Sequence, residues 1–268
     1  MATQEIEKRG ETGNNVEVER DSVHKEIAIV KMNRATGNKL STDFMTELNT
    51  TLEKLENDDS CRGIILTSAI AGIFSLGLDG TEMYQKSLES TSAFWRSLQD
   101  FWMRLYGSKL ATVAAINGHS PATGCQMAMS CDYRVMSEGP FGIGLPEVTV
   151  GLVAPFWFQE VMVKTCGERQ TEMAVGLGTM FTPEEALKIG LVDEVVRPGD
   201  LISKAREQLL KWLKNPDRPR AMTKDMRRGP LLEKLRAQQE EDIATFNEYI
   251  HEKSVQESFG MSLESRKK

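Results

Sequence analysis

The sequence predicts an α/β protein in which a core of alternating strands and helices precedes a region made of helices alone. Up to about residue 200, short apolar runs typical of buried strands alternate with segments whose apolar residues recur at helical spacing. From Leu201 onward, helix formers and charged residues dominate. The first 15 residues are polar and contain two glycines, so a disordered tail is expected there. We therefore expect a tail over 1–15, a core over 16–200 and a helical region over 201–268.

Composition narrows the class of protein. The 268-residue chain is 40% hydrophobic, which is enough to bury a sizeable core. Its net charge of -6 arises from dense charges of both signs, which argues against a nucleic-acid partner. No apolar run approaches the ~20 residues of a membrane span, so no membrane insertion is expected. The acidic first twenty residues resemble neither a signal peptide nor a transit peptide, which favours a cytoplasmic or a processed protein.

Cysteine and histidine spacing gives no metal site. The four cysteines are scattered without a CxxC pair, a pattern that favours buried free thiols over disulfides or ligands. They are Cys61, Cys125, Cys131 and Cys166. The three histidines are too dispersed for a metal cluster. His119 follows a strand-end glycine, and we expect its ring to hydrogen-bond backbone in a turn rather than to act in catalysis.

The first part of the core is predicted to begin with a hairpin of strands over 16–19 and 27–32. Ser41 then caps a helix with four apolar residues on one face. The unbroken apolar run over 63–68 predicts a buried strand. Glycines at both ends and in the middle of 72–80 indicate a backbone that bends tightly against another segment, so this loop is a candidate site.

The middle of the chain contains the stretch around which the site is expected. An aromatic-rich helix over 94–105 leads to a buried strand over 111–116. A Gly/Ser/Pro turn then opens a short buried helix over 124–129, before a strand over 132–136. Backbone N–H groups at such a helix start lack partners, so they can receive a negatively charged oxygen.

A loop, two helices and a strand complete the predicted core. The loop spans 141–151 and contains Glu147. Helices are predicted over 155–165 and 182–190, with a proline in the first turn of the earlier one, and a short strand over 191–196. The C-terminal region is expected to form two or three helices, separated at Pro216, Pro219 and Gly229-Pro230.

Several catalytic motifs are absent from the sequence. Residues 118–122 lack the last glycine of GxSxG, and there is no Walker loop and no HExxH. Residues 142–147 and 176–181 each begin like the dinucleotide-binding GxGxxG but lack its third glycine. A nicotinamide site is therefore weakly supported.

Three segments carry a family likeness in their residues and spacing: Phe74–Asp79, Ala115–Gly118 with Cys131–Arg134, and Gly144–Gly151. Together they resemble the crotonase, or enoyl-CoA hydratase/isomerase, superfamily. Four further segments are most similar to its mitochondrial isomerase branch: Leu55–Asp58, Arg62–Ser68, Leu78–Met83 and Ala154–Trp157. The likeness runs from about Val16 to near the C terminus.

This resemblance implies a ClpP/crotonase-like spiral of ββα units, with a C-terminal helical region that builds a homotrimer. It also implies an acyl-CoA substrate, the mitochondrial matrix as location, and no metal or redox cofactor, since coenzyme A is part of the substrate. Family members hold the thioester oxygen with two backbone N–H groups, which fall by position on Leu76 and Thr123. Loss of an α-proton places charge on that oxygen, and each preorganised donor stabilises the charge by about 3 kcal/mol.

The resemblance also selects a reaction. Hydratases use two glutamates; the second aligns with Glu147, whereas Gln126 stands at the first and cannot ionise. Hydration needs one carboxylate to activate water and another to deliver a proton, so Gln126 argues against it. One base suffices to move a double bond, so we expect a Δ3,Δ2-enoyl-CoA isomerase acting on unsaturated fatty acyl-CoA in β-oxidation. Weak hydration, thioester hydrolysis and a catalytically silent acyl-CoA-binding protein remain as alternatives.

The individual site residues have alternatives as well. Burial is expected to raise the pKa of Glu147, against the alternative of a surface carboxylate. Thr123 departs from the glycine usual in the family, and its branched side chain narrows the space beside the thioester. Gln126 is expected to be a buried amide tied to backbone groups. The residues assigned to the substrate site are Phe74, Leu78, Gln126, Phe156 and Trp157, with a core position as the alternative for the last two.

Charged residues near the site have weaker assignments. Asp79 is expected to cap the helix that follows its loop. Lys224, Arg227 and Arg228 are expected on a solvated helix face rather than at a coenzyme A phosphate. Lys39 is a candidate for the adenine side of the substrate.

Overall fold

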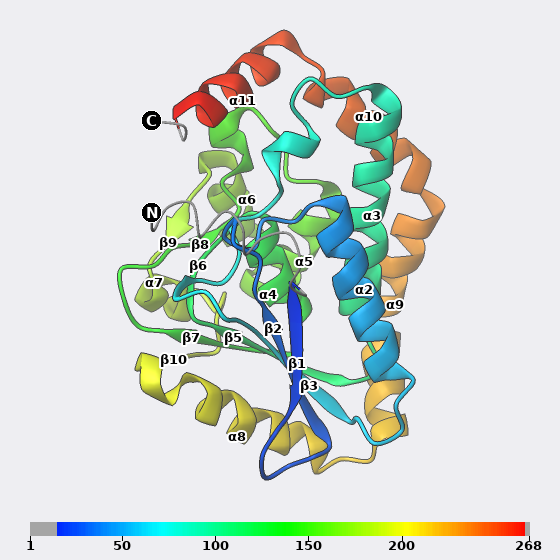
Figure 1. Ribbon diagram of the computed structural model, residues 1–268, viewed down its shortest axis with the longest axis vertical. Helices are drawn as coiled ribbons and strands as arrows, with labels where there is room; N and C mark the ends of the chain where they lie inside the picture. Colours follow the sequence, from blue (N-terminus) through cyan, green and yellow to red (C-terminus); the bar gives the residue numbers. More distant parts are fainter. Residues whose placement is uncertain (1–14, 266–268) are drawn as a thin grey trace, which may run out of the picture.

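The larger of two sheets forms the base of the molecule (Figure 1). The computed structural model describes residues 15–265, with side chains through residue 260, so the expected tail lies almost wholly outside the described residues. The strands run in the order β1 (Val16–Arg20), β2 (Ile27–Met32), β3 (Gly63–Ser68), β5 (Ala111–Ile116), β7 (Tyr133–Ser137) and β10 (Glu194–Val196). β1 and β2 are antiparallel and the later neighbours are parallel. The predicted hairpin and buried strands are confirmed.

The smaller sheet carries the loops of the site. Its order is β4 (Gly72–Ile73), β6 (Gly118–Pro121), β8 (Ile143–Gly144) and β9 (Met180–Phe181). The sequence predicted loops and turns over the first three, because strands of two to four residues are too short to show alternation. Glycine makes the pairing of β4 with β6 possible. A Cβ built on Gly118 would lie 1.9 Å from the carbonyl carbon of Gly72.

Successive ββα units wind through both sheets. In each of the units β3–β4, β5–β6 and β7–β8, the first strand lies in the larger sheet and the second in the smaller one. The helices that follow are α3 (Leu88–Gly107), α4 (Thr123–Ser130) and α5 (Phe156–Cys166), while β1, β2 and α2 (Thr42–Glu56) form the opening unit. This repeat is the spiral of ββα units that the family resemblance implied.

Local signals set most helix ends. The Ser41 hydroxyl accepts the Phe44 N–H at 3.3 Å and caps α2 as predicted. Thr182 and Glu185 form a reciprocal capping box at α7 (Pro183–Lys188). Pro155 stands just before α5 instead of in its first turn. The helix α6 (Glu168–Leu177) was not predicted.

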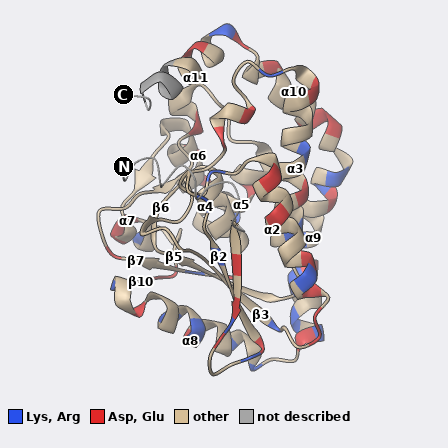
Figure 2. Ribbon diagram, viewed as in Figure 1, with Lys and Arg blue, Asp and Glu red and all other residues tan. Residues whose placement is uncertain are grey.

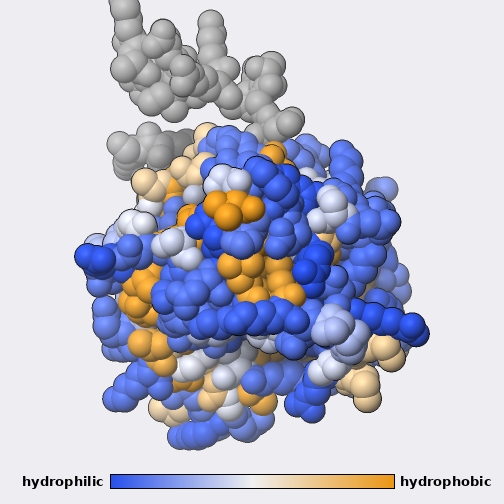
Figure 3. Space-filling view, turned by 90° about the horizontal axis from the view of Figure 1, so that it is seen from below, coloured by the Kyte–Doolittle hydropathy of each residue, from blue (hydrophilic) through white to orange (hydrophobic). Residues whose placement is uncertain are grey.

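The C-terminal region contains four helices in the described part of the chain, more than predicted. They are α8 (Leu201–Leu213), α9 (Asp217–Ala237), α10 (Gln239–Ile250) and α11 (Lys253–Ser265). α8 packs on the larger sheet (Figure 1). The face of the molecule seen from below is mostly hydrophilic and has separate apolar patches (Figure 3). Pro216 separates α8 from α9 as expected.

The other two predicted breaks are wrong, because α9 continues through them. Pro219 lies in the first turn, where an N–H needs no partner. Pro230 lies in the helix interior, between Arg228, which is anchored by the ion pair described next, and the buried Leu231. Tertiary contacts on both sides therefore outweigh the lost hydrogen bond.

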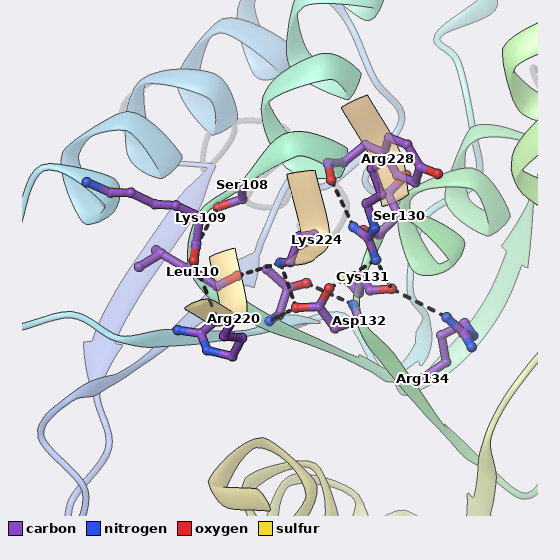
Figure 4. A network of polar contacts seen from close by, with 12 residues as sticks. Ser108, Lys109, Leu110, Ser130, Cys131, Asp132, Arg134, Arg220, Lys224 and Arg228 are labelled. Carbon is purple, nitrogen blue, oxygen red and sulfur yellow. Dashed lines mark hydrogen bonds and ion pairs between the residues drawn. The ribbon is translucent and has the colours of Figure 1, made fainter. Parts of the chain in front are cut away.

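A buried ion network fixes α9 to the core (Figure 4). The Asp132 carboxylate lies 2.7 Å from Lys224 Nζ and 3.0 Å from an Arg228 guanidinium nitrogen. Lys224 Nζ also donates to the Leu110 carbonyl oxygen at 2.6 Å, and burial lowers its pKa to about 8. The solvated face predicted for Lys224 and Arg228 is therefore wrong, whereas Arg227 is exposed as expected. Charges of both signs otherwise lie along the outer helices (Figure 2).

Candidate active site

A cavity of about 190 Å³ contains the residues on which the predicted chemistry depends. It lies where the loop after β4, the start of α4, the turn after β8 and the C-terminal helices α10 and α11 meet. Leu76, Thr123 and Glu147 all line it, although they are far apart in the sequence. The cavity therefore brings together the expected base and both expected N–H carriers.

Glu147 is buried in the wall of this cavity. It begins a 3-10 turn over Glu147–Val150 and is only 8% exposed. One carboxylate oxygen, Oε2, has no hydrogen-bond partner among the described residues. Burial disfavours the charged form and raises the pKa of Glu147 to about 7. The group thus exchanges a proton near neutral pH, as a general base must, and the alternative of a surface carboxylate is wrong.

Thr123 offers a free donor at the start of α4. It is the first residue of the helix, and its N–H has no acceptor within the described part of the chain. Ala122, directly before it, has φ 52° and ψ -121°, a conformation that non-glycine residues adopt rarely and at a cost of about 1–3 kcal/mol. This turn directs the chain into α4 on the cavity wall. A branched residue at position 123 is therefore compatible with the tight turn.

Leu76 differs from the prediction in one respect. Its N–H donates to the carbonyl oxygen of Gly37 at 3.0 Å, so it is not free in this conformation. Its side chain is 36% exposed and lines the cavity. No local pattern could predict this bond, because Gly37 lies in a different turn, far from Leu76 in the sequence.

Asn38 is a structural part of the site that the sequence analysis missed. It is fully buried, has φ 53°, and its side-chain amide donates to the Phe74 carbonyl oxygen at 2.9 Å. Its own carbonyl oxygen accepts the Ser75 hydroxyl at 2.8 Å. These two bonds hold the loop that carries Leu76. The Gly37-Asn38 pair in a polar turn is the signal that could have indicated it.

The residues assigned to the substrate site divide into two groups. Leu78 lines the cavity, whereas Phe74 and Trp157 are fully buried core residues, and the Trp157 indole N–H donates to Asp242 at 3.2 Å. Phe156 lines a second cavity beside the first. Lining residues that the sequence analysis missed include Met83, Phe158, Tyr249 and Phe259, which tertiary packing alone brings to the cavity.

Gln126 is buried, but not in the way expected. It is 1% exposed, and neither atom of its side-chain amide has a hydrogen-bond partner among the described residues. The expectation that backbone groups hold the amide is therefore wrong. The residue lies in α4, one turn beyond Thr123.

Two structural assignments are confirmed and one is wrong. His119 Nδ1 accepts the Gly142 N–H at 3.1 Å. The four cysteines are free, and all but the half-buried Cys166 are buried. Asp79 does not cap the helix that follows its loop, because Ser87 caps α3. Asp79 instead caps the short 3-10 turn over Gly80–Glu82, accepting the Thr81 N–H at 3.2 Å, and pairs with Arg34 at 2.9 Å.

Among residues 15–265, three or more His, Cys, Asp or Glu side chains nowhere gather in an arrangement that could hold a metal ion. None of the helices described has the length and apolar character of a membrane span.

Comparison with known proteins adds an independent observation. The sequence profile of the family "Enoyl-CoA hydratase/isomerase" matches residues 22–268. The chain is 48% identical to "Enoyl-CoA delta isomerase 1, mitochondrial" of Mus musculus, over 90% of this chain and 84% of that protein. The Homo sapiens protein of the same name is 43% identical, over 90% and 80%. The crystal structure of human mitochondrial delta3-delta2-enoyl-CoA isomerase matches with a TM-score of 0.92 and 42% identity, covering 94% and 98% of the two chains. The crotonase fold is confirmed.

Proposed function

Because the chain belongs to the enoyl-CoA hydratase/isomerase family, we propose that it is a Δ3,Δ2-enoyl-CoA isomerase of unsaturated fatty acyl-CoA. The observation that carries this proposal is one buried carboxylate, Glu147, in a cavity that Thr123 also lines, with a Thr123 N–H that has no acceptor among the described residues. By the family resemblance, Gln126 occupies the position of the first of the two hydratase glutamates, and Glu147 that of the second. A site with a single carboxylate fits proton transfer within the substrate better than addition of water.

The proposed reaction moves one proton. Ionised Glu147 removes a proton from C2 of a 3-enoyl-CoA, and the C–H electron pair spreads over the thioester and the double bond as a dienolate. The protonated carboxyl group then delivers the proton to C4, which leaves a double bond between C2 and C3 in the trans form. The step is redox-neutral and balanced, so no metal or redox cofactor is required, and coenzyme A enters only as part of the substrate.

Backbone donors stabilise the dienolate oxygen in this proposal. The Thr123 N–H, which has no acceptor within residues 15–265, is the principal donor. The Leu76 N–H contributes as a shared donor, since it can form a three-centre bond to Gly37 and to the substrate. We therefore assign the larger part of the stabilisation to Thr123.

In this proposal, assembly follows the family resemblance and location follows the names of the relatives. We propose a homotrimer built through the C-terminal helices, and a location in the mitochondrial matrix. Relatives that are 43–48% identical are named mitochondrial.

A substrate assay tests the proposal. The purified protein is given 3-decenoyl-CoA, and the absorbance of the conjugated 2-enoyl thioester is followed. We expect it to rise with turnover. Release of free coenzyme A would instead indicate a thioester hydrolase. Formation of 3-hydroxydecanoyl-CoA from 2-decenoyl-CoA would indicate a hydratase. If no substrate is converted, the protein is a catalytically silent binding protein.

A further inference from the structure

A second cavity of about 670 Å³ lies directly behind the site. The two cavities share four lining residues, Val153, Pro155, Phe246 and Tyr249, which form the wall between them. The cavity that contains Glu147, at about 190 Å³, is smaller than the 300–1,000 Å³ of ordinary ligand sites. A long acyl chain therefore needs more room than this cavity provides.

The wall residues differ in how firmly neighbouring groups hold them. Phe246 is 1% exposed and stacks on Trp95, with ring centroids 3.9 Å apart. The Pro155 carbonyl oxygen accepts the Phe158 N–H at 2.9 Å, and this bond holds Pro155 at the start of α5. The Tyr249 ring is half-buried and meets Phe246 edge-on at 5.7 Å. Its hydroxyl donates one long bond of 3.3 Å, to the carbonyl oxygen of Val153, which is itself 55% exposed.

We propose that Tyr249 is a gate that sets the range of acyl chain lengths, an inference that rests on the proposed function. With its ring across the wall, the inner cavity accepts short acyl groups. When the side chain rotates away, the bond to Val153 breaks and a saturated tail passes into the outer cavity. Tyr249 thus determines specificity and takes no part in proton transfer.

The outer cavity offers apolar surface to the end of an acyl chain. Ala154, Phe156, Val163 and Val175 line it, with the four wall residues. Lys234 and five acidic residues also line it, and the ammonium group of Lys234 lies 4.8 Å from the Phe156 ring centroid. The acidic residues are Glu160, Glu168, Glu172, Glu241 and Asp242. Each methylene group buried on this surface strengthens binding about fourfold.

Binding of saturated acyl-CoA tests the gate without turnover. Dissociation constants of hexanoyl-CoA and palmitoyl-CoA are measured by titration calorimetry for the wild type and three variants. Tyr249→Ala is expected to favour palmitoyl-CoA over hexanoyl-CoA by a further fivefold or more. Val175→Phe, which fills the outer cavity, is expected to weaken palmitoyl-CoA binding alone. Glu248→Ala, on the same helix but outside both cavities, is the control and is expected to leave the ratio unchanged.

The outcomes separate this inference from the proposed function. If the wild type isomerises 3-hexenoyl-CoA but neither Tyr249→Ala nor Val175→Phe changes the ratio of the two affinities, the gate is refuted and the isomerase stands. If the wild type neither binds these thioesters nor converts the unsaturated one, the proposed function fails and the gate with it.

Discussion

Gly124 packs directly against the carbonyl oxygen of Ser75: a Cβ built on Gly124 would lie 2.5 Å from that oxygen. Ser75 precedes Leu76, and Gly124 follows Thr123, so this contact sets the spacing between the two segments that carry the N–H donors. The contact is made by backbone atoms of both residues, which cannot move aside as the end of a flexible side chain could. A side-chain atom added at Gly124 must therefore push the two segments apart.

Gly124→Ala is therefore expected to misplace the donors. A displacement of about 1 Å costs on the order of 100-fold in turnover, and the overpacking costs about 1–3 kcal/mol of stability. Turnover of 3-decenoyl-CoA and urea unfolding measure the two effects. Gly199→Ala is the matched control, because nothing lies within 4 Å of a Cβ there. Wild-type turnover in Gly124→Ala would show that donor spacing does not limit the reaction.

Leu76→Pro removes the N–H that is bonded to Gly37. Because this donor is shared, its loss is expected to lower kcat at least tenfold, but by less than the about 10²–10³-fold typical of a dedicated donor. Leu76→Ala keeps the N–H and is expected to retain most of kcat. Thermal unfolding verifies that both variants are folded. Equal kcat values in the two variants would show that the Leu76 N–H does not stabilise the dienolate oxygen.

The raised pKa of Glu147 predicts the pH dependence of catalysis. The base acts in its ionised form, so kcat/KM is expected to rise tenfold per pH unit below about pH 7 and to level off above it. Initial rates between about pH 5 and pH 9 test this. A plateau that extends down to about pH 5 would mean that the ionising group is not a buried carboxyl group.

The same shift predicts a pH-dependent stability. A carboxyl group whose pKa is higher in the folded protein than the ordinary 4.5 stabilises the fold below pH 4.5, and this stabilisation is lost as the pH rises through about 7. The Glu147→Gln variant has no ionisable group at this position, so this contribution to the pH dependence of stability is absent. Its melting temperature is expected to exceed that of the wild type increasingly from about pH 5 to pH 8. A constant difference across this range would contradict a buried, titrating Glu147.

Gln126 is expected to reduce the stability of the fold, because its buried side-chain amide has no hydrogen-bond partner in the described part of the chain. Gln126→Met has a similar volume and no unsatisfied polar group, so it is expected to raise the free energy of unfolding by about 1–3 kcal/mol while isomerase activity remains. A less stable Gln126→Met variant would indicate that ordered water satisfies the amide.

Gln126→Glu supplies a second carboxyl group, and we expect measurable hydration of 2-decenoyl-CoA.

Local patterns in the sequence predicted the strands of the larger sheet, the Ser41 cap and the helix start that can receive a negatively charged oxygen. Each depends on residues close together in the chain, such as an apolar run or a cap and its N–H. Glu147 and Thr123 were assigned to the site by the resemblance to a known family, which also supplied their roles.

What the sequence did not predict depends on contacts between distant segments. The bond from Leu76 to Gly37 needs two turns brought together by the spiral. The wall at Tyr249 forms only when α10 packs beside α5. Pro230 indicated a break, but the burial of Leu231 and the ion pair at Arg228 hold α9 through it.

The comparison of Glu147→Gln with the wild type tests the central claim most directly. The amide keeps the shape of the side chain but cannot accept the C2 proton. Conversion of 3-decenoyl-CoA is followed by the absorbance of the conjugated thioester, with the melting temperature as the check on folding. We predict a loss of about 10²–10⁴-fold in kcat, the range for removal of a general base. Equal rates in a folded variant would contradict the assignment of Glu147 as the base.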